Sequence, residues 1–180
     1  MGEIINTKGL VHVYTGEGKG KTTAALGTAM RAVGWGLKVC VIQFIKGYAD
    51  IGEALFAKRF PENLTIKQFT TDCSRSIDEK KVSQRKRVSQ EAMAYAEQAV
   101  RNNNYDLIIL DEINNAAHFN LIETDRILQM IQNKPEHLEL ILTGRDAPQE
   151  IIEAADYVTE MKMIKHPYEQ GIQARKGIDY

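Results

Sequence analysis

The stretch TGEGKGKTT, from Thr15 to Thr23, constrains the fold of this chain more than any other feature. An apolar segment, Leu10–Tyr14, precedes it and is typical of a buried strand, and an alanine-rich segment, Lys21–Val33, follows it and is typical of a helix. A glycine-rich turn between a strand and a helix binds anions, because its N–H groups point inward and the helix N-terminus adds positive potential. This order favours a phosphate-binding loop over a flexible surface turn.

The loop departs from the standard pattern, G-x-x-x-x-G-K-[ST], by one residue. The first glycine of that pattern would fall at position 15, where the chain has Thr15, and the nearest glycine is Gly16. Lys21 is expected to reach phosphate oxygens, and Thr22 is expected to place its hydroxyl on Mg²⁺. Lys19 adds a second positive charge inside the loop.

The second half of such a site is expected at LIILDE, residues Leu107 to Glu112. Four apolar residues carry the chain through a sheet, and two carboxylates then emerge at its carboxyl edge, where ligands bind in open α/β sheets. In P-loop proteins a carboxylate at this place holds Mg²⁺, directly or through water. The alternative is a helix cap, but the loop upstream favours the metal role for Asp111 and Glu112.

Short apolar runs alternate with longer amphipathic segments along the whole chain. The expected strands are Leu10–Tyr14, Leu37–Ile45, Thr65–Phe69, Tyr105–Leu110, Leu138–Leu142 and Tyr157–Ile164. The expected helices are Lys21–Val33, Ile51–Phe60, Asp78–Asn103, Leu121–Gln132 and Pro148–Ala155. Apolar strands separated by helices predict a parallel sheet that is covered on both faces. Residues 1–180 are expected to form a single domain, because no linker divides them.

Composition and charge exclude several classes of protein. The formal net charge of -1 gives no global attraction to nucleic acid or to an acidic membrane. The longest apolar runs, such as Val39–Ile45, are too short to span a bilayer, and Met1–Lys8 lacks the pattern of a signal peptide. The two cysteines, Cys40 and Cys73, fit a reducing compartment. We therefore expect a cytoplasmic protein.

The loop alone leaves several nucleotide reactions open. A regulatory GTPase needs a guanine-reading N-K-x-D after a strand, but NKPE, Asn133–Glu136, precedes a strand and is better explained as a helix stop. A small kinase needs a basic lid, but the basic segment Glu79–Arg87 is better explained as the solvated face of a helix. An ATPase that uses Glu112 as the base that activates water agrees with the spacing.

The segments around these motifs resemble a known family. The strings VYTGEGKGKTTAALGTAMRAVG, VIQFIKG, LDE, LTGR and KHPYEQGIQARKGIDY occur in this order. Together they resemble the P-loop ATP:corrinoid adenosyltransferases, also called cob(I)yrinic acid a,c-diamide adenosyltransferases. The resemblance runs from Gly9 to Tyr180, and the shortened loop is the form that this family has.

The resemblance implies an α/β protein with a RecA-like P-loop fold, whose mostly parallel central sheet has about six strands with helices on both faces. It implies that the 5′-deoxyadenosyl group of ATP is transferred to Co(I) of a corrinoid and that triphosphate is released. ATP is held in the reverse direction through the loop in this family. The resemblance further implies Mg²⁺, a flavoprotein electron donor for the corrinoid and a homodimer.

The resemblance also implies roles for individual residues. The nucleotide-binding residues are Gly16, Glu17, Gly18, Lys19, Gly20, Lys21, Thr22, Thr23, Arg31 and Arg145. The metal-side residues are Thr22, Asp111 and Glu112, and the catalytic residues are Lys21, Thr22 and Glu112. For Arg31 the alternative is a surface arginine, and for Arg145 it is a cap on the sheet edge. His166 and Tyr168 either border the corrinoid or have a structural role.

Two features depart from the family pattern. Some members carry an extra N-terminal helix that covers the partner's site, whereas about nine residues precede the first expected strand here. Some members also present a Phe-x-Trp pair after the third strand, which helps to expel the lower nitrogen ligand of cobalt. The corresponding region, Gln68–Ser76, contains no tryptophan, and its Phe69 is expected to belong to the strand.

Overall fold

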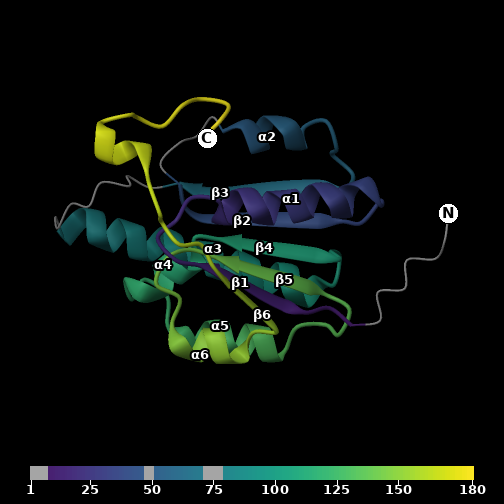
Figure 1. The fold of residues 1–180 in the computed structure, drawn as a ribbon. Helices are drawn as coiled ribbons and strands as arrows, with labels where there is room; N and C mark the ends of the chain where they lie inside the picture. Colours follow the sequence, from purple (N-terminus) through teal and green to yellow (C-terminus); the bar gives the residue numbers. More distant parts are fainter. Residues whose placement is uncertain (1–7, 47–50, 71–78) are drawn as a thin grey trace.

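The computed structural model describes residues 8–46, 51–70 and 79–180 and places their six strands in one parallel sheet (Figure 1). The strand order is β3-β2-β4-β5-β1-β6. The strands are β1 (Val11–Thr15), β2 (Val39–Lys46), β3 (Leu64–Thr70), β4 (Leu107–Asp111), β5 (Glu139–Thr143) and β6 (Tyr157–Glu160). Each pair of neighbours is parallel, so the predicted fold class is confirmed.

Helices cover both faces of this sheet, with α1 and α2 on one side and α5 and α6 on the other (Figure 1). The helices are α1 (Lys21–Gly34), α2 (Gly52–Ala57), α3 (Glu79–Asn102), α4 (Ile113–His118), α5 (Thr124–Gln132) and α6 (Gln149–Ala154), followed by the 3₁₀-helix η1 (Pro167–Gln170). None of the helices described is long and apolar enough to cross a bilayer.

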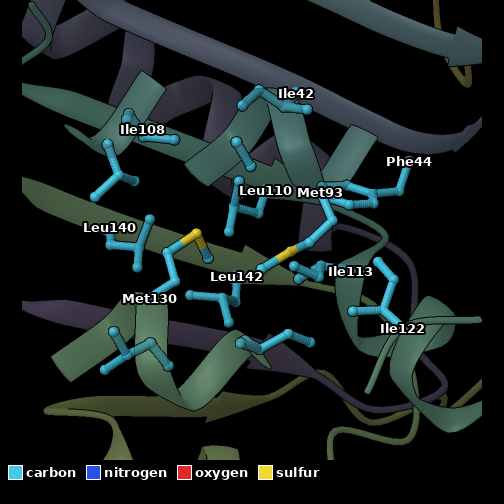
Figure 2. Close-up of a cluster of buried hydrophobic side chains, with 14 of the residues drawn as sticks. Ile42, Phe44, Met93, Ile108, Leu110, Ile113, Ile122, Met130, Leu140 and Leu142 are labelled. Carbon is cyan, nitrogen blue, oxygen red and sulfur yellow. The ribbon is translucent and has the colours of Figure 1, made fainter. Parts of the chain in front are cut away.

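The inner strands β2, β4 and β5 are mostly apolar because their two faces are buried against different helices, whereas the edge strand β6 is exposed. In β2, Val39 and Val41 pack with the alanines of α1, whereas Cys40, Ile42 and Phe44 face the opposite core. That larger core gathers side chains from β2, β4 and β5 against α3, α4 and α5 (Figure 2). Burial of each large aliphatic side chain there contributes about 1.5–3 kcal/mol relative to its exposure.

The two longest helices form because small and apolar residues recur on one face of each. In α3, Val88, Ala92 and Ala99 are buried on one face of the helix. In α1, Ala25, Ala29 and Ala32 are buried, and these small side chains allow the helix to lie close to the sheet. This close packing holds the start of α1 directly beyond the end of β1.

Several element boundaries differ from the prediction. The helix expected from Leu121 begins only at Thr124, because Leu121 and the next residue are buried core residues in the preceding turn. The short helix α4 and the 3₁₀-helix η1 were not expected. Phe69 does belong to β3, and its ring centroid lies 5.9 Å from that of Tyr95. Cys73 and the rest of the region at 71–76 lie outside the described residues.

Three strands bring the predicted site residues to one edge. The carboxyl ends of parallel strands meet at the same edge of a sheet, and here β5 lies between β1 and β4. The loop after β1, the acidic residues after β4 and the end of β5 therefore lie next to one another. Tyr14 pairs with Thr143, and Leu110 pairs with Leu142, which aligns the three strand ends.

Candidate active site

The loop between β1 and α1 has a backbone that glycine makes possible. Gly16 and Gly20 have φ angles of 91° and 120°, in the region that other residues rarely adopt. A Cβ atom on Gly18 would lie 2.6 Å from the carbonyl oxygen of Met161, whose carbonyl accepts a hydrogen bond from the Gly18 N–H. The segment after β6 thus packs tightly on the loop, and side chains at these glycines would push the two apart.

Thr15 occupies the place of the missing first glycine and has contacts of its own. It is the last residue of β1, and its carbonyl oxygen accepts a hydrogen bond of 2.8 Å from the N–H of Met161. Its hydroxyl oxygen accepts a hydrogen bond of 3.2 Å from the N–H of Ala147, in the loop after β5. The bond to Met161 uses the backbone, which any residue has, so the threonine side chain adds only the contact with the loop after β5.

Lys21 folds back over the loop. Its Nζ donates hydrogen bonds to the carbonyl oxygens of Gly16 and Gly18, at 2.6 and 2.8 Å, and the residue is only 9% exposed. Burial lowers the pKa of Lys21 below its ordinary value of 10.5, and the negative charge of Glu112 partly opposes this effect. Lys21 is thus a largely desolvated cation that faces an acidic group across the pocket.

Asp111 is fully buried and is held by three donors. Its Oδ1 accepts hydrogen bonds of 2.7 Å from the hydroxyls of Thr22 and Thr143, and its Oδ2 accepts one of 3.2 Å from Nε2 of Gln43. The same Gln43 Nε2 lies 3.1 Å from Oε1 of Glu53. A buried carboxylate with this many donors is fixed in one orientation, and it fixes the Thr22 hydroxyl in turn.

Glu112 adopts a left-handed backbone conformation, with φ 68° and ψ 17°, at the N-terminus of α4. This conformation is uncommon outside glycine and typically costs on the order of 1–3 kcal/mol. The backbone N–H of Glu112 donates a hydrogen bond of 3.1 Å to the Thr143 hydroxyl. The left-handed turn directs Glu112 toward the phosphate loop, where it contributes to the pocket wall.

These groups surround a pocket of about 220 Å³. It is lined by Glu17, Gly18, Lys19, Gly20, Lys21, Thr22, Thr23, Glu112, Arg145, His166 and Asp179. Gly16 and Asp111 lie behind this lining, in contact with Lys21 and Thr22. Most of the residues singled out by the sequence therefore come together at one place.

Arg31 is not among the residues that line this pocket. It is an exposed residue in the last turn of α1, ten positions along the helix from Lys21. At 1.5 Å per residue this separation is roughly 15 Å. The structure thus places Arg31 apart from the other predicted nucleotide-binding residues. Tyr168 is 70% exposed and also lies outside the lining, whereas His166 belongs to it.

Two ion pairs join residues that line the pocket. The Arg145 guanidinium lies 3.2 Å from the Glu17 carboxylate, and the Lys19 ammonium lies 3.4 Å from the carboxylate of Asp179. Asp179 also accepts hydrogen bonds from the backbone N–H and the side chain of Arg175, and these bonds lower the pKa of Asp179 to about 2. Carboxylates of the chain itself thus neutralise two of the cations that face the pocket.

The sequence did not single out Thr143, Asn115 or Asp179 as site residues. Thr143 precedes the Gly144–Arg145 pair, so its place at a strand end was the available signal. Asn115 accepts a hydrogen bond of 2.7 Å from the N–H of Arg145, which anchors the loop after β5 to α4. Asp179 gave no signal, because its contact depends on how the C-terminal segment folds back (the yellow chain in Figure 1).

Comparisons with known proteins agree with this arrangement. The family model described as ATP:corrinoid adenosyltransferase BtuR/CobO/CobP matches residues 7–180. A corrinoid adenosyltransferase of Pseudomonas aeruginosa is 38% identical over an alignment that covers 96% of this chain and 84% of that protein. A corrinoid adenosyltransferase of Escherichia coli is 34% identical over 173 residues, which cover 96% of this chain and 86% of that protein.

A solved structure supports the fold independently. A KaiC-like protein from Pyrococcus horikoshii superposes with a TM-score of 0.56 and 18% identity, covering 88% of this chain and 75% of that one. At this identity the similarity concerns the fold alone, which is the RecA-like α/β fold. The family model and the relatives extend over nearly the whole chain, site included. This chain therefore belongs to the ATP:corrinoid adenosyltransferase family.

Proposed function

We propose that this chain transfers the 5′-deoxyadenosyl group of ATP to Co(I) of a corrinoid and releases triphosphate. The observation that carries the proposal is the convergence of Lys19, Lys21 and Arg145 on a pocket beside the shortened loop. Its volume of about 220 Å³ is below the roughly 300–1,000 Å³ of pockets that enclose a whole small molecule. The enclosed part therefore suits the phosphate chain, with the sugar carbon left at the opening.

The chemistry needs positioning more than proton transfer. The electron pair of Co(I) attacks C5′ of the ribose, the C5′–O bond breaks, and its electrons leave with triphosphate. The cobalt is the nucleophile, so no protein base has to activate it. Alignment of the two reactants supplies up to roughly 7–11 kcal/mol of barrier reduction. Lys19, Lys21 and the loop amides stabilise the charge on the departing triphosphate.

We propose that Thr22 and Glu112 hold Mg²⁺, which neutralises phosphate charge when it is bound. Mg²⁺ prefers oxygen ligands, and both side chains line the pocket. The hydroxyl proton of Thr22 is donated to Asp111, so the oxygen lone pairs of Thr22 remain available to a cation. Oδ1 of Asp111 already accepts two hydroxyl protons. Asp111 therefore acts through Thr22.

We also propose the setting in which this reaction takes place. Residues 1–180 act as one domain, since the described strands form one sheet. The resemblance to the family supports a homodimer, a flavoprotein that reduces the corrinoid, and a cytoplasmic location. Among the pocket residues, His166 is the candidate for contact with the corrinoid, because it lies in the lining near the phosphate loop.

The test is anaerobic incubation of the protein with Mg·ATP and chemically reduced cobalamin. We expect the absorbance spectrum of adenosylcobalamin to appear, together with one triphosphate for each adenosyl group transferred. Orthophosphate release that does not require corrinoid would instead support an ATPase with Glu112 as its base. Tight ATP binding without any product would indicate a nucleotide-binding module and would contradict the proposal.

ATP binding should depend on pH through Lys21. In the free protein, burial lowers the pKa of Lys21, and bound phosphates raise it because they favour the charged form. ATP affinity should therefore be constant below the lowered pKa and should fall as the pH rises through it. At pH values above the lowered pKa, ATP binding should be accompanied by the uptake of a proton, which calorimetry in buffers of different ionisation enthalpy detects. Proton release over this range would show that Lys21 does not meet the phosphates.

A further inference from the structure

The end of β5 places one hydroxyl between the two candidate acidic residues. Thr143 is the last residue of β5, which lies between the strand that precedes the phosphate loop and the strand that ends in Asp111. Its side chain is fully buried. Its Oγ1 donates to Oδ1 of Asp111 at 2.7 Å and accepts from the backbone N–H of Glu112 at 3.1 Å.

We propose that Thr143 is a positioning residue that sets both the Asp111 carboxylate and the Glu112 turn for metal-bound ATP. This inference rests on the function proposed above. Oδ1 of Asp111 accepts hydrogen bonds from the hydroxyls of both Thr143 and Thr22, so the orientation of the Thr22 hydroxyl depends on the Thr143 hydroxyl. Thr143 thus controls the two groups assigned to Mg²⁺ without touching either the metal or the nucleotide.

The backbone of Glu112 gives the second link. Its left-handed conformation is uncommon for a residue with a side chain, and it requires a local interaction to persist. The hydrogen bond from the Glu112 N–H to Thr143 supplies that interaction and satisfies a donor at the N-terminus of α4. Without the hydroxyl, the turn that directs Glu112 into the pocket loses its described side-chain acceptor.

Two substitutions separate the hydroxyl from the shape of the side chain. Thr143→Val keeps the branched shape suited to a strand and removes the hydroxyl, whereas Thr143→Ser keeps the hydroxyl and removes one methyl. Ser89→Ala is the matched control, because it removes a buried hydroxyl from α3, a helix that contributes no residue to the pocket lining. Calorimetry then measures the ATP affinity of each protein with and without Mg²⁺.

We expect Mg²⁺ to strengthen ATP binding in the unmodified protein, in Thr143→Ser and in Ser89→Ala. In Thr143→Val this gain should shrink by about 10- to 100-fold, the usual effect of removing a partner of a metal ligand. The metal-free ATP affinity of Thr143→Val should stay within about twofold, since the loop itself is unchanged. If Thr143→Val does not fold, Thr143→Ala removes the same hydroxyl and should show the same loss.

Several results would overturn the inference. The full gain from Mg²⁺ in Thr143→Val, or in Thr143→Ala, would show that the hydroxyl is not needed. A loss in Thr143→Ser as large as the loss in Thr143→Val would show the same. An equal loss of metal-free and metal-bound affinity would mean a structural role only. If the unmodified protein still forms adenosylcobalamin, any of these outcomes rejects only the role of Thr143 and leaves the proposed function intact. An unmodified protein that forms no adenosylcobalamin and shows no gain from Mg²⁺ would reject the proposed function as well.

Discussion

Replacing Lys21 with alanine should lower kcat/KM for ATP by roughly 10²- to 10³-fold, or about 3–4 kcal/mol. Lys21 is the largely buried cation of the loop, and its ammonium group is held by the carbonyl oxygens of Gly16 and Gly18. A phosphate bound in the pocket would lose its desolvated charged partner. Steady-state kinetics of adenosylcobalamin formation, with ATP varied at saturating reduced cobalamin, measures the change.

The Lys21→Ala protein should nevertheless fold. The substitution removes two hydrogen bonds, but it also removes a cation whose burial is unfavourable, as its lowered pKa indicates. We therefore expect the free energy of unfolding to change by about 1 kcal/mol. Lys38→Ala is the control, because Lys38 is exposed and precedes β2 at the opposite edge of the sheet. Urea denaturation compares the three proteins. Near-normal turnover in folded Lys21→Ala would show that this loop is not the phosphate site.

Replacing Asp111 with asparagine should damage both stability and activity. The Asp111 carboxylate accepts hydrogen bonds from Thr22, Thr143 and Gln43. Asparagine has only one acceptor oxygen, so its NH₂ group would face at least one of these donors. We expect unfolding free energy to fall by about 2–4 kcal/mol and turnover to fall by roughly 10²-fold. Thermal denaturation should show a midpoint lower by about 5–15 °C.

Two controls make the Asp111 result specific. Asp125→Asn changes an exposed aspartate in the first turn of α5, so it should lower the free energy of unfolding by less than about 1 kcal/mol and leave turnover unchanged. Glu112→Gln changes a side chain of the pocket wall and should reduce turnover with Mg·ATP without the loss of stability. If Asp111→Asn matched the unmodified protein in melting temperature and Mg·ATP affinity, the buried network would have no part in the site.

The sequence predicted the parts of the site that depend on local order along the chain. A strand, a glycine-rich turn and a helix that follow one another must place the loop at a strand end, so Lys21 and Thr22 were predictable. An apolar strand that ends in two carboxylates similarly located Asp111 and Glu112. These predictions needed only the spacing of the apolar residues, the turn residues and the rule that ligands bind at the carboxyl edge of a parallel sheet.

The parts that escaped prediction depend on neighbours that are distant in the chain. Thr143 matters because β5 lies between β1 and β4, and the order of strands is not encoded in the periodicity of any one of them. Helix α4 is six residues long, too short for a helical period to appear. Asp179 reaches Lys19 only because the C-terminal segment returns to the loop. Tertiary placement, and not local propensity, decided all three.

The boundary errors have a similar cause. Leu121 and Ile122 continue an apolar pattern into α5, but both are buried by the core in a turn before the helix begins. Arg31 lies on the helix that follows the loop, and its distance along that helix was readable from the spacing to Lys21. The family resemblance assigned Arg31 to the nucleotide, and that role stays a prediction.

The central claim is that the loop holds triphosphate as a leaving group while the cobalt attacks carbon. It is tested most directly with ATP that carries ¹⁸O at the oxygen between C5′ and the α-phosphorus. After a single turnover with reduced cobalamin, mass spectrometry of the released triphosphate locates the label. Cleavage of the C5′–O bond predicts that triphosphate retains the ¹⁸O. Recovery of the label in ADP, AMP or adenosine, with unlabelled phosphate released, would mean attack at phosphorus and would contradict the account.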